Sequence, residues 1–277
     1  MEIDCLAKLS ALAHDKRLAV FRLLVRRYPD AVPAGEISAA LGFKPNTASA
    51  YLAALTKAQL ISQKRSGNSL RYTANLEGVR GLFSSLLSDC CNNRPDACLF
   101  PALDLPRQPS LETPLKVLFL CSANAARSIM AEALLNHLGE GRFQAFSAGT
   151  KPQATPDSTV LQLLGSRGHD TTSLRSKSLQ DLHLPETMQM DLVFTLCDQA
   201  ANEHCPSWPN HPISAHWGLS DPLQAKADQA AKNLALHQSY AILKERIQRL
   251  VALPYAALDR ISLQQQCDSI GTIGDDR

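Results

Sequence analysis

Two side chains of this sequence have the types and spacing for covalent chemistry on an oxyanion: Cys121 and Arg127, which are six residues apart. An apolar run, Val117–Leu120, leads into the cysteine, and a segment with helical periodicity, Ser128–Leu138, follows the arginine. A strand, a loop and a helix N-terminus in this order point backbone N–H groups and the helix dipole at one place. A tetrahedral oxyanion fits such a place, with the guanidinium binding it through two hydrogen bonds. The same field would hold Cys121 as a thiolate, the form that attacks phosphorus or arsenic.

The segment Cys121–Ser128 resembles the C-x5-R-S loop of low-molecular-weight tyrosine phosphatases and of the arsenate reductases that share their fold. The resemblance implies that Cys121 is the nucleophile and Arg127 the oxyanion ligand. It also implies that the Ser128 hydroxyl steadies the thiolate and that Asn124 shapes the loop. The chain departs from the family where alanine replaces the usual glycine, serine and cysteine, at Ala123, Ala125 and Ala126.

Two further thiols, Cys197 and Cys205, follow the strand-like stretch Leu192–Leu196. In a parallel sheet they would lie at the same edge as Cys121. The sequence around them resembles the redox segment of thioredoxin-linked arsenate reductases. That resemblance implies a relay in which Cys197 attacks the Cys121 adduct and Cys205 then attacks Cys197.

An Asp-Pro turn, Asp221–Pro222, resembles the acid loop of the same family. The resemblance makes Asp221 the general acid that protonates the leaving oxygen. We expect no tightly bound cofactor. Thioredoxin is the expected electron donor, and glutathione, glutaredoxin or a similar thiol is the alternative.

Strand-like and helix-like segments alternate from Leu115 onward, which predicts a parallel sheet with helices on both faces. With the resemblance, the expected class is an α/β fold of low-molecular-weight phosphatase type over residues 115–258. A proline-rich segment, residues 99–114, predicts an extended linker before it. Residues 259–277 are expected to form a polar tail.

Residues 1–98 predict a mainly α domain with a winged helix-turn-helix. Helical segments at 33–41 and 46–58 are joined by Gly42–Phe43–Lys44, the geometry of a helix-turn-helix. Strand-like segments flank Ser66–Gly67–Asn68, which predicts a hairpin between residues 61 and 73. Basic residues outnumber acidic ones in residues 1–110, and acidic residues prevail in the remainder. This asymmetry indicates that only the first domain contacts nucleic acid.

The first domain resembles the ArsR family of metalloid-sensing repressors through Leu12–Ala13–His14, Arg17–Leu18, Glu36–Ile37 and the basic hairpin. The resemblance implies a homodimer, formed through this domain, that reads a two-fold symmetric operator DNA. The side chains expected at base edges are Thr47, Ser49, Ala50 and Tyr51. Those expected at phosphates are Lys44, Lys57, Lys64, Arg65 and Arg71.

Three cysteines near the end of this domain, Cys90, Cys91 and Cys98, predict a metalloid site. Arsenite and antimonite are soft and take three thiolates. Adjacent side chains on a helix point about 100° apart, so chelation by Cys90 and Cys91 together should distort the helix end. Arsenite would thereby act as an inducer that weakens DNA binding. Incidental thiols are the alternative.

Length and composition bound the remaining possibilities. A chain of 277 residues suffices for two domains, and eight cysteines outside a small disulfide framework fit a reducing cytosol. No apolar run reaches the ~18 residues of a membrane span, and Met1–Ser10 lacks the basic region of a secretory signal. We therefore expect a cytoplasmic protein without a membrane partner.

Two other functions stay open at this level. The second domain could be a tyrosine phosphatase fused to a metalloregulator. The three loop alanines also allow a pure regulator with a degenerate enzyme domain.

Overall fold

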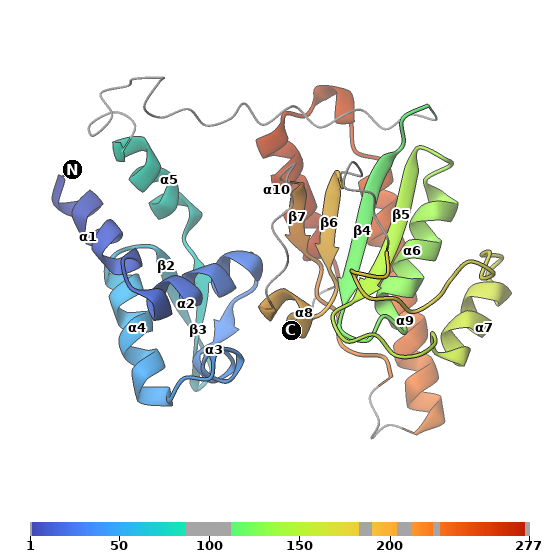
Figure 1. Cartoon of the computed structure of the whole chain (residues 1–277), viewed down its shortest axis with the longest axis horizontal. Helices are drawn as coiled ribbons and strands as arrows, with labels where there is room; N and C mark the ends of the chain where they lie inside the picture. The colour runs from blue at the N-terminus through green and yellow to red at the C-terminus, as the bar shows by residue number, and fades with distance from the viewer. Residues whose placement is uncertain (1, 87–111, 183–189, 204–211, 224–227, 275–277) are drawn as a thin grey trace. The chain divides into compact units, whose positions relative to one another are not determined.

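The computed structural model describes residues 2–86, 112–182, 190–203, 212–223 and 228–274 (Figure 1). Contacts divide the chain into two units, Met1–Leu103 and Asp104–Arg277, each with its own hydrophobic core. The predicted limits of the domains and of the linker stay predictions. Among the described residues, no helix combines the length and the apolar character that crossing a membrane requires.

The first unit is mainly helical and carries a small antiparallel sheet in the order β1-β3-β2. Its elements are α1 (Glu2–Leu12), α2 (Asp15–Arg26), β1 (Val32–Pro33), α3 (Ala34–Leu41), α4 (Pro45–Lys57), β2 (Ile61–Ser66), β3 (Ser69–Ala74) and α5 (Leu76–Ser85).

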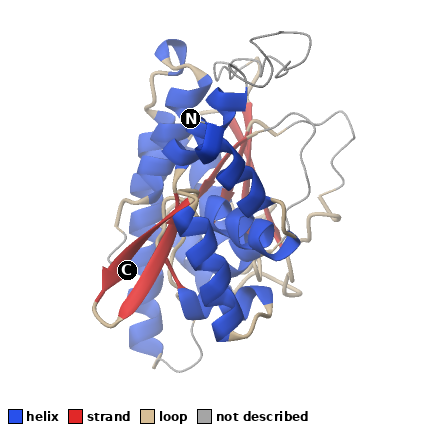
Figure 2. Ribbon diagram, turned by 90° about the vertical axis from the view of Figure 1, so that its left-hand side faces the viewer, coloured by secondary structure: helices blue, strands red, loops and turns tan. Residues whose placement is uncertain are grey.

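Local sequence explains the turns of this unit. Gly42 ends α3 with φ +67°, a left-handed conformation that glycine adopts without a Cβ clash, and the chain then enters α4. Gly67, with φ +59°, turns the predicted hairpin, in which Ser66 pairs with Ser69. Figure 2 shows this hairpin, in red, extending from the helices of the first unit. Side chains spaced three and four residues apart face the core, such as Val20, Leu23 and Leu24 of α2.

The second unit contains a four-stranded parallel sheet in the order β5-β4-β6-β7. Its elements are β4 (Leu115–Cys121), α6 (Arg127–Leu138), β5 (Phe143–Gly149), α7 (Ser158–Ser166), β6 (Leu192–Thr195), α8 (Asp198–Asn202), β7 (Ile213–His216), α9 (Gln229–Val251), a 3-10 turn η2 (Tyr255–Ala257) and α10 (Arg260–Gly271).

Strand β4 is apolar on both faces because both faces of the sheet are covered. Val117 and Phe119 pack in the core that contains side chains of α6 and α9. Leu118 and Leu120 alternate with them and pack in a second cluster with Val193 of β6. The strand therefore stands at the centre of the unit, and its carboxyl end brings Cys121 to the edge where ligands bind in such folds.

The expectation of a polar tail over residues 259–277 is wrong for its described part. Residues Arg260–Gly271 form α10, which packs against β7. Leu263, Cys267 and Ile270 are buried there. Their spacing of four and three residues is that of a helix with one buried face. The segment is polar on average because polar residues lie between these three, and the prediction of a polar tail followed from that average.

Candidate active site

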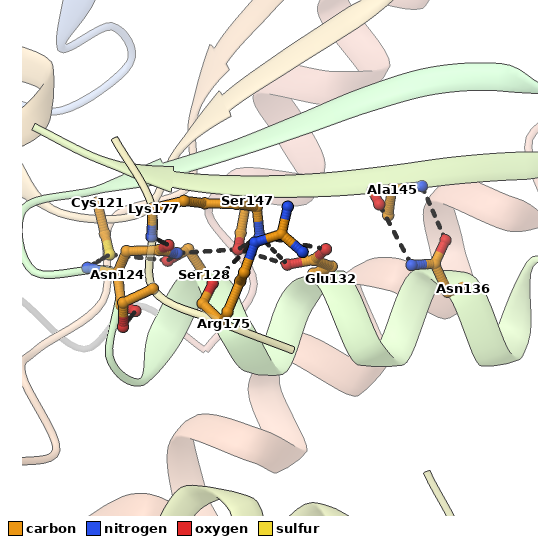
Figure 3. Close-up of polar contacts among 10 residues, drawn as sticks. Cys121, Asn124, Ser128, Glu132, Asn136, Ala145, Ser147, Arg175 and Lys177 are labelled. Atoms are coloured by element: carbon orange, nitrogen blue, oxygen red, sulfur yellow. Dashed lines mark hydrogen bonds and ion pairs between the residues drawn. The ribbon is translucent and has the colours of Figure 1, made fainter. Parts of the chain in front are cut away.

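The loop between β4 and α6 surrounds the sulfur of Cys121 with hydrogen-bond donors. The Ser128 hydroxyl lies 2.8 Å from the Cys121 sulfur, and the backbone N–H of Asn124 donates to the sulfur at 3.2 Å. Figure 3 shows these three residues together at the N-terminus of α6. The structure therefore brings together the predicted nucleophile, the predicted hydroxyl and the predicted loop-shaping residue.

Asn124 is fully buried and is the centre of the loop's hydrogen bonds. Its side-chain Nδ2 donates to the hydroxyls of Ser128 and Ser147, both at 2.9 Å. Its side-chain Oδ1 accepts from the backbone N–H of Lys177 at 2.8 Å. Its φ of +47° lies in the left-handed region, which asparagine tolerates better than most residues.

The loop also depends on a glycine at the end of β5. A Cβ on Gly149 would lie 2.6 Å from the carbonyl oxygen of Ser122 and 3.0 Å from the Cβ of Asn124. A side chain at this position would therefore push the loop away from the sheet.

A buried ion pair between Lys177 and Glu132 supports the same loop, and the sequence analysis did not predict it. The Lys177 ammonium lies 3.1 Å from a Glu132 carboxylate oxygen, and the Ser147 hydroxyl donates to the same carboxylate (Figure 3). The sequence offers one clue, because Glu132 interrupts an apolar helix four residues after Ser128. Lys177 lies in a loop far along the chain and carries no such signal.

Burial and the neighbouring hydrogen-bond donors act on the pKa of the Cys121 thiol in opposite directions. Burial raises the pKa of Cys121, and this effect outweighs the lowering by the Ser128 hydroxyl, Arg127 and the Asn124 N–H. The thiol of Cys197 raises the pKa further. The loop donors and Arg127 therefore act on the pKa in the direction that the sequence predicts, and burial acts against them.

Arg127 and Asp221 lie next to each other, although they are far apart in the sequence. The guanidinium of Arg127 donates to the carbonyl oxygen of Leu219 at 2.8 Å, and its other terminal nitrogen lies 3.3 Å from the Asp221 carboxylate. Arg127 is buried, whereas the Asp221 side chain is 46% exposed. The carboxylate can therefore exchange protons with solvent while it faces the arginine that belongs to the Cys121 loop.

Cys197 directly precedes α8 and serves as its N-cap, with the backbone N–H of Ala200 donating to its sulfur at 3.4 Å. The hydroxyl of Ser122, the residue after Cys121, lies 3.5 Å from the same sulfur. The second thiol thus borders the Cys121 loop, as its position after a neighbouring parallel strand predicts. Cys205 lies outside the described residues, as do Cys90, Cys91 and Cys98.

The residues predicted to bind DNA lie on α4, on the turn before it and on the hairpin. Exposed members of this set are Lys44, Thr47, Ser49, Ala50, Lys57, Lys64 and Arg65. Tyr51 and Arg71 are partly buried. Tyr51 packs against the rings of His14 and Phe43, and Arg71 donates to the carbonyl oxygen of Ala31. These two side chains therefore already have contacts within the unit.

Comparison with known proteins identifies the family of the second unit. Residues 116–265 match the model of the low molecular weight phosphotyrosine protein phosphatase family, and the chain belongs to that family. Its parallel sheet is the α/β fold of this type that the sequence predicts.

The relatives include an arsenate reductase from Bacillus licheniformis, which is 33% identical over 135 residues, 48% of this chain and 92% of that protein. A solved arsenate reductase from Archaeoglobus fulgidus has 29% identity and covers 50% of this chain and 99% of its own, with a TM-score of 0.39. A thioredoxin-dependent arsenate reductase from Corynebacterium glutamicum has 26% identity and covers 50% of this chain and 61% of its own, with a TM-score of 0.38.

Proposed function

We propose that the second unit is an arsenate reductase in which Cys121 is the nucleophile. The observation that carries this proposal is the thiol of Cys197 beside the Cys121 loop, with the Ser122 hydroxyl 3.5 Å from its sulfur. Hydrolysis of a phosphate ester needs one thiol, because water resolves the thiophosphate. Reduction of arsenic needs a second thiol, which takes up the first sulfur while arsenic gains two electrons. The similarity to the B. licheniformis arsenate reductase supports the same reaction.

In the first step the loop N–H groups and Arg127 bind arsenate, and Cys121 attacks arsenic as a thiolate. A sulfur–arsenic bond forms, and one arsenate oxygen leaves as water after taking a proton from Asp221. The bound anion allows the thiol to ionise, because an arsenate oxygen can accept the proton of Cys121. The loop donors that already contact the sulfur then stabilise the thiolate.

In the second step the Cys197 thiolate attacks the sulfur of Cys121. A Cys121–Cys197 disulfide forms, and the electrons of the sulfur–arsenic bond stay on arsenic, which leaves as arsenite. Cys205 then attacks Cys197, so that Cys121 is released as a thiolate and a Cys197–Cys205 disulfide remains. A dithiol protein such as thioredoxin reduces that disulfide by exchange.

Turnover with purified components tests this proposal. The full chain is mixed with arsenate, thioredoxin, thioredoxin reductase and NADPH, and arsenite formation is followed for wild type, Cys121→Ser, Cys197→Ser and Cys205→Ser. We expect all three variants to lose turnover and the oxidised wild type to carry a Cys197–Cys205 disulfide in peptide mass spectra. Absence of arsenite formation by the wild type, together with hydrolysis of an aryl phosphate that Cys197→Ser leaves unchanged, would identify a phosphatase instead. Turnover in Cys205→Ser with glutathione and glutaredoxin would identify the small-thiol route.

We propose a second function for the first unit, an arsenite-responsive repressor that binds operator DNA as a homodimer. Exposed Thr47, Ser49 and Lys57 on α4 and the exposed basic hairpin support DNA contact. Exposed Leu6 and Leu9 on α1, at 67% and 39%, support a contact between two copies of this helix. Cys90, Cys91 and Cys98 are the proposed arsenite ligands, because trivalent arsenic takes three thiolates.

A gel-shift titration with the promoter region of the protein's own gene tests the DNA-binding proposal. We expect binding as a dimer to a symmetric site, with an affinity that falls steeply as salt rises because phosphate contacts release counterions. Equal affinity for unrelated DNA at physiological salt would contradict a repressor.

A further inference from the structure

A fully buried arginine on α9, Arg246, joins the chain that precedes Asp221 to the segment that follows α10. Its Nη1 donates to the carbonyl oxygen of Trp217 at 2.8 Å and lies 3.5 Å from that of Gly218. Its Nε and Nη2 donate to the carbonyl oxygen of Ile273 at 3.0 and 2.8 Å. We propose that Arg246 is a positioning residue for the general-acid loop, residues 218–222, and that Ile273 is part of the same device.

The chemistry of arginine suits this role. A guanidinium is planar and always charged, and its donors point in fixed directions, so it holds two carbonyl groups at a set separation. A charged group with no exposed surface is costly unless its donors are satisfied. The main chain at Trp217 and at Ile273 is therefore held in the places where it satisfies Arg246.

The Trp217 side chain is held as firmly as its carbonyl group. Its indole N–H donates to the carbonyl oxygen of Cys267 in α10 at 2.9 Å, and its ring stacks on Phe194 with 4.1 Å between centroids. Gly271 of α10 approaches so closely that a Cβ would lie 2.7 Å from the Trp217 ring. Trp217 is thus a fixed point from which the general-acid loop starts.

Among the described residues, a cavity borders the loop beyond this fixed point. A cavity of about 330 Å³ separates residues 218–222 from α9, where Gln238 and Ile242 line it, and Gly274 borders it. Among the described residues, Asp221 accepts a hydrogen bond from the backbone N–H of Leu223 at 3.0 Å and lies 3.3 Å from Arg127, which also binds the Leu219 carbonyl oxygen. The start of the loop is held by the contacts of Trp217 and Gly218 with Arg246.

The inference rests on the proposed function, in which Asp221 protonates the leaving oxygen. Loss of the clamp should misplace this carboxyl group without changing the nucleophile or the loop that binds arsenate. The effect of Arg246 on the rate should therefore run through Asp221, and the two residues should not act independently.

Single-turnover kinetics of the full-length reduced protein provide the test, because arsenite release then precedes any reaction with thioredoxin. The variants are Arg246→Met, Asp221→Asn and the double variant. Arg249→Met is the matched control, since Arg249 is an exposed arginine of the same helix. We expect Asp221→Asn to slow the reaction about 100-fold. We expect Arg246→Met to slow it at least about tenfold, as misplacement of a catalytic group does.

Three results together support the clamp. The double variant reacts no more slowly than Asp221→Asn, the half-saturating arsenate concentration is unchanged in Arg246→Met, and iodoacetamide labels Cys121 at the wild-type rate. Losses that multiply in the double variant, or a wild-type rate in Arg246→Met, would overturn the inference. If Asp221→Asn itself reacts at the wild-type rate, the proposed acid role fails, independently of Arg246.

Two further variants keep the test decisive if Arg246→Met does not fold. Arg246→Lys retains the charge without the planar fork, and a chain that ends at Thr272 lacks the Ile273 carbonyl group. Each is combined with Asp221→Asn in the same cycle. The proposal is supported if either change slows the reaction of the wild type but does not slow the Asp221→Asn variant further. It is contradicted if the change slows Asp221→Asn by the same factor as the wild type, or does not slow the wild type at all.

Discussion

At the scale of single residues, the Cys121 loop depends most on Asn124. Asn124→Ala removes hydrogen bonds to the Ser128 and Ser147 hydroxyls and to the Lys177 N–H. We expect a loss of about 1–3 kcal/mol in the free energy of unfolding, because these buried groups lose partners. We also expect slower single-turnover reduction of arsenate, since Ser128 is no longer held against the sulfur.

Asn136→Ala is the matched control for this prediction. The Asn136 side chain pairs with the backbone of Ala145 at 2.8 and 3.2 Å, away from Cys121 (Figure 3). Urea unfolding should show a similar loss of stability for both variants, whereas only Asn124→Ala should slow the reaction. Equal rates for the two variants would show that Asn124 acts on stability alone.

The pH dependence of Cys121 reactivity follows from its surroundings. Burial raises the pKa of Cys121, so iodoacetamide labelling should be slow at neutral pH and should increase with pH beyond the usual range of a thiol. Ser128→Ala removes a hydrogen bond that lowers the pKa, so its labelling midpoint should move to higher pH. Cys197→Ser removes an effect that raises the pKa, so its midpoint should move to lower pH. Peptide mass spectrometry measures both midpoints, and shifts in one common direction would refute this account.

At the scale of elements, α10 forms hydrogen bonds with the edge strand of the parallel sheet. The Gln264 amide donates to the carbonyl oxygen of Ser214 at 2.9 Å, and its own oxygen lies 3.4 Å from the Ser214 N–H. Strand β7 is the last strand of the sheet, so this side chain takes up hydrogen bonds that an edge strand leaves unpaired. The helix therefore supports both the sheet edge and the start of the loop at residues 218–222.

Substitution of two helical glycines by alanine distinguishes the close packing of α10 from a general effect on helix stability. Gly271→Ala in α10 places a Cβ 2.7 Å from the carbonyl oxygen of His216, so we expect a loss of about 1–3 kcal/mol. Gly165→Ala in α7 meets nothing within 4 Å, so we expect no loss or a gain of about 0.4–1 kcal/mol. Thermal unfolding of the full chain measures both, and a stable Gly271→Ala variant would contradict the close packing of α10.

At the scale of the whole molecule, the two proposed functions together imply that arsenate acts as an inducer only after it is reduced to arsenite. Three thiolates bind trivalent arsenic but offer nothing to a tetrahedral arsenate anion. Arsenite should therefore release wild-type protein from its operator directly, and arsenate should do so only after reduction at Cys121. In a purified system with reductant, Cys121→Ser should respond to arsenite and not to arsenate.

A Cys90/Cys91 double serine variant should behave in the opposite way. It should keep reductase turnover and stay on the operator in arsenite, because the proposed inducer ligands are gone. Gel shifts and arsenite assays on the same preparations measure both properties. Release of this variant at micromolar arsenite would place the sensor site elsewhere in the chain.

The sequence by itself determined the features that depend on neighbouring residues. A β4 run that is apolar on both faces, a cysteine at its end and an arginine at the next helix N-terminus specify a strand, a loop and a helix through local spacing. The parallel order of alternating elements also places Cys197 at the edge that carries Cys121, because parallel strands share their carboxyl edge.

Only the tertiary structure decided the contacts between distant segments. Lys177 meets Glu132, and Arg246 meets both Trp217 and Ile273, across separations that no periodic pattern encodes. The effect of burial on the pKa of Cys121 belongs here as well. The sequence shows the donors around the sulfur, but the opposing cost of burial depends on how closely the folded loop excludes water.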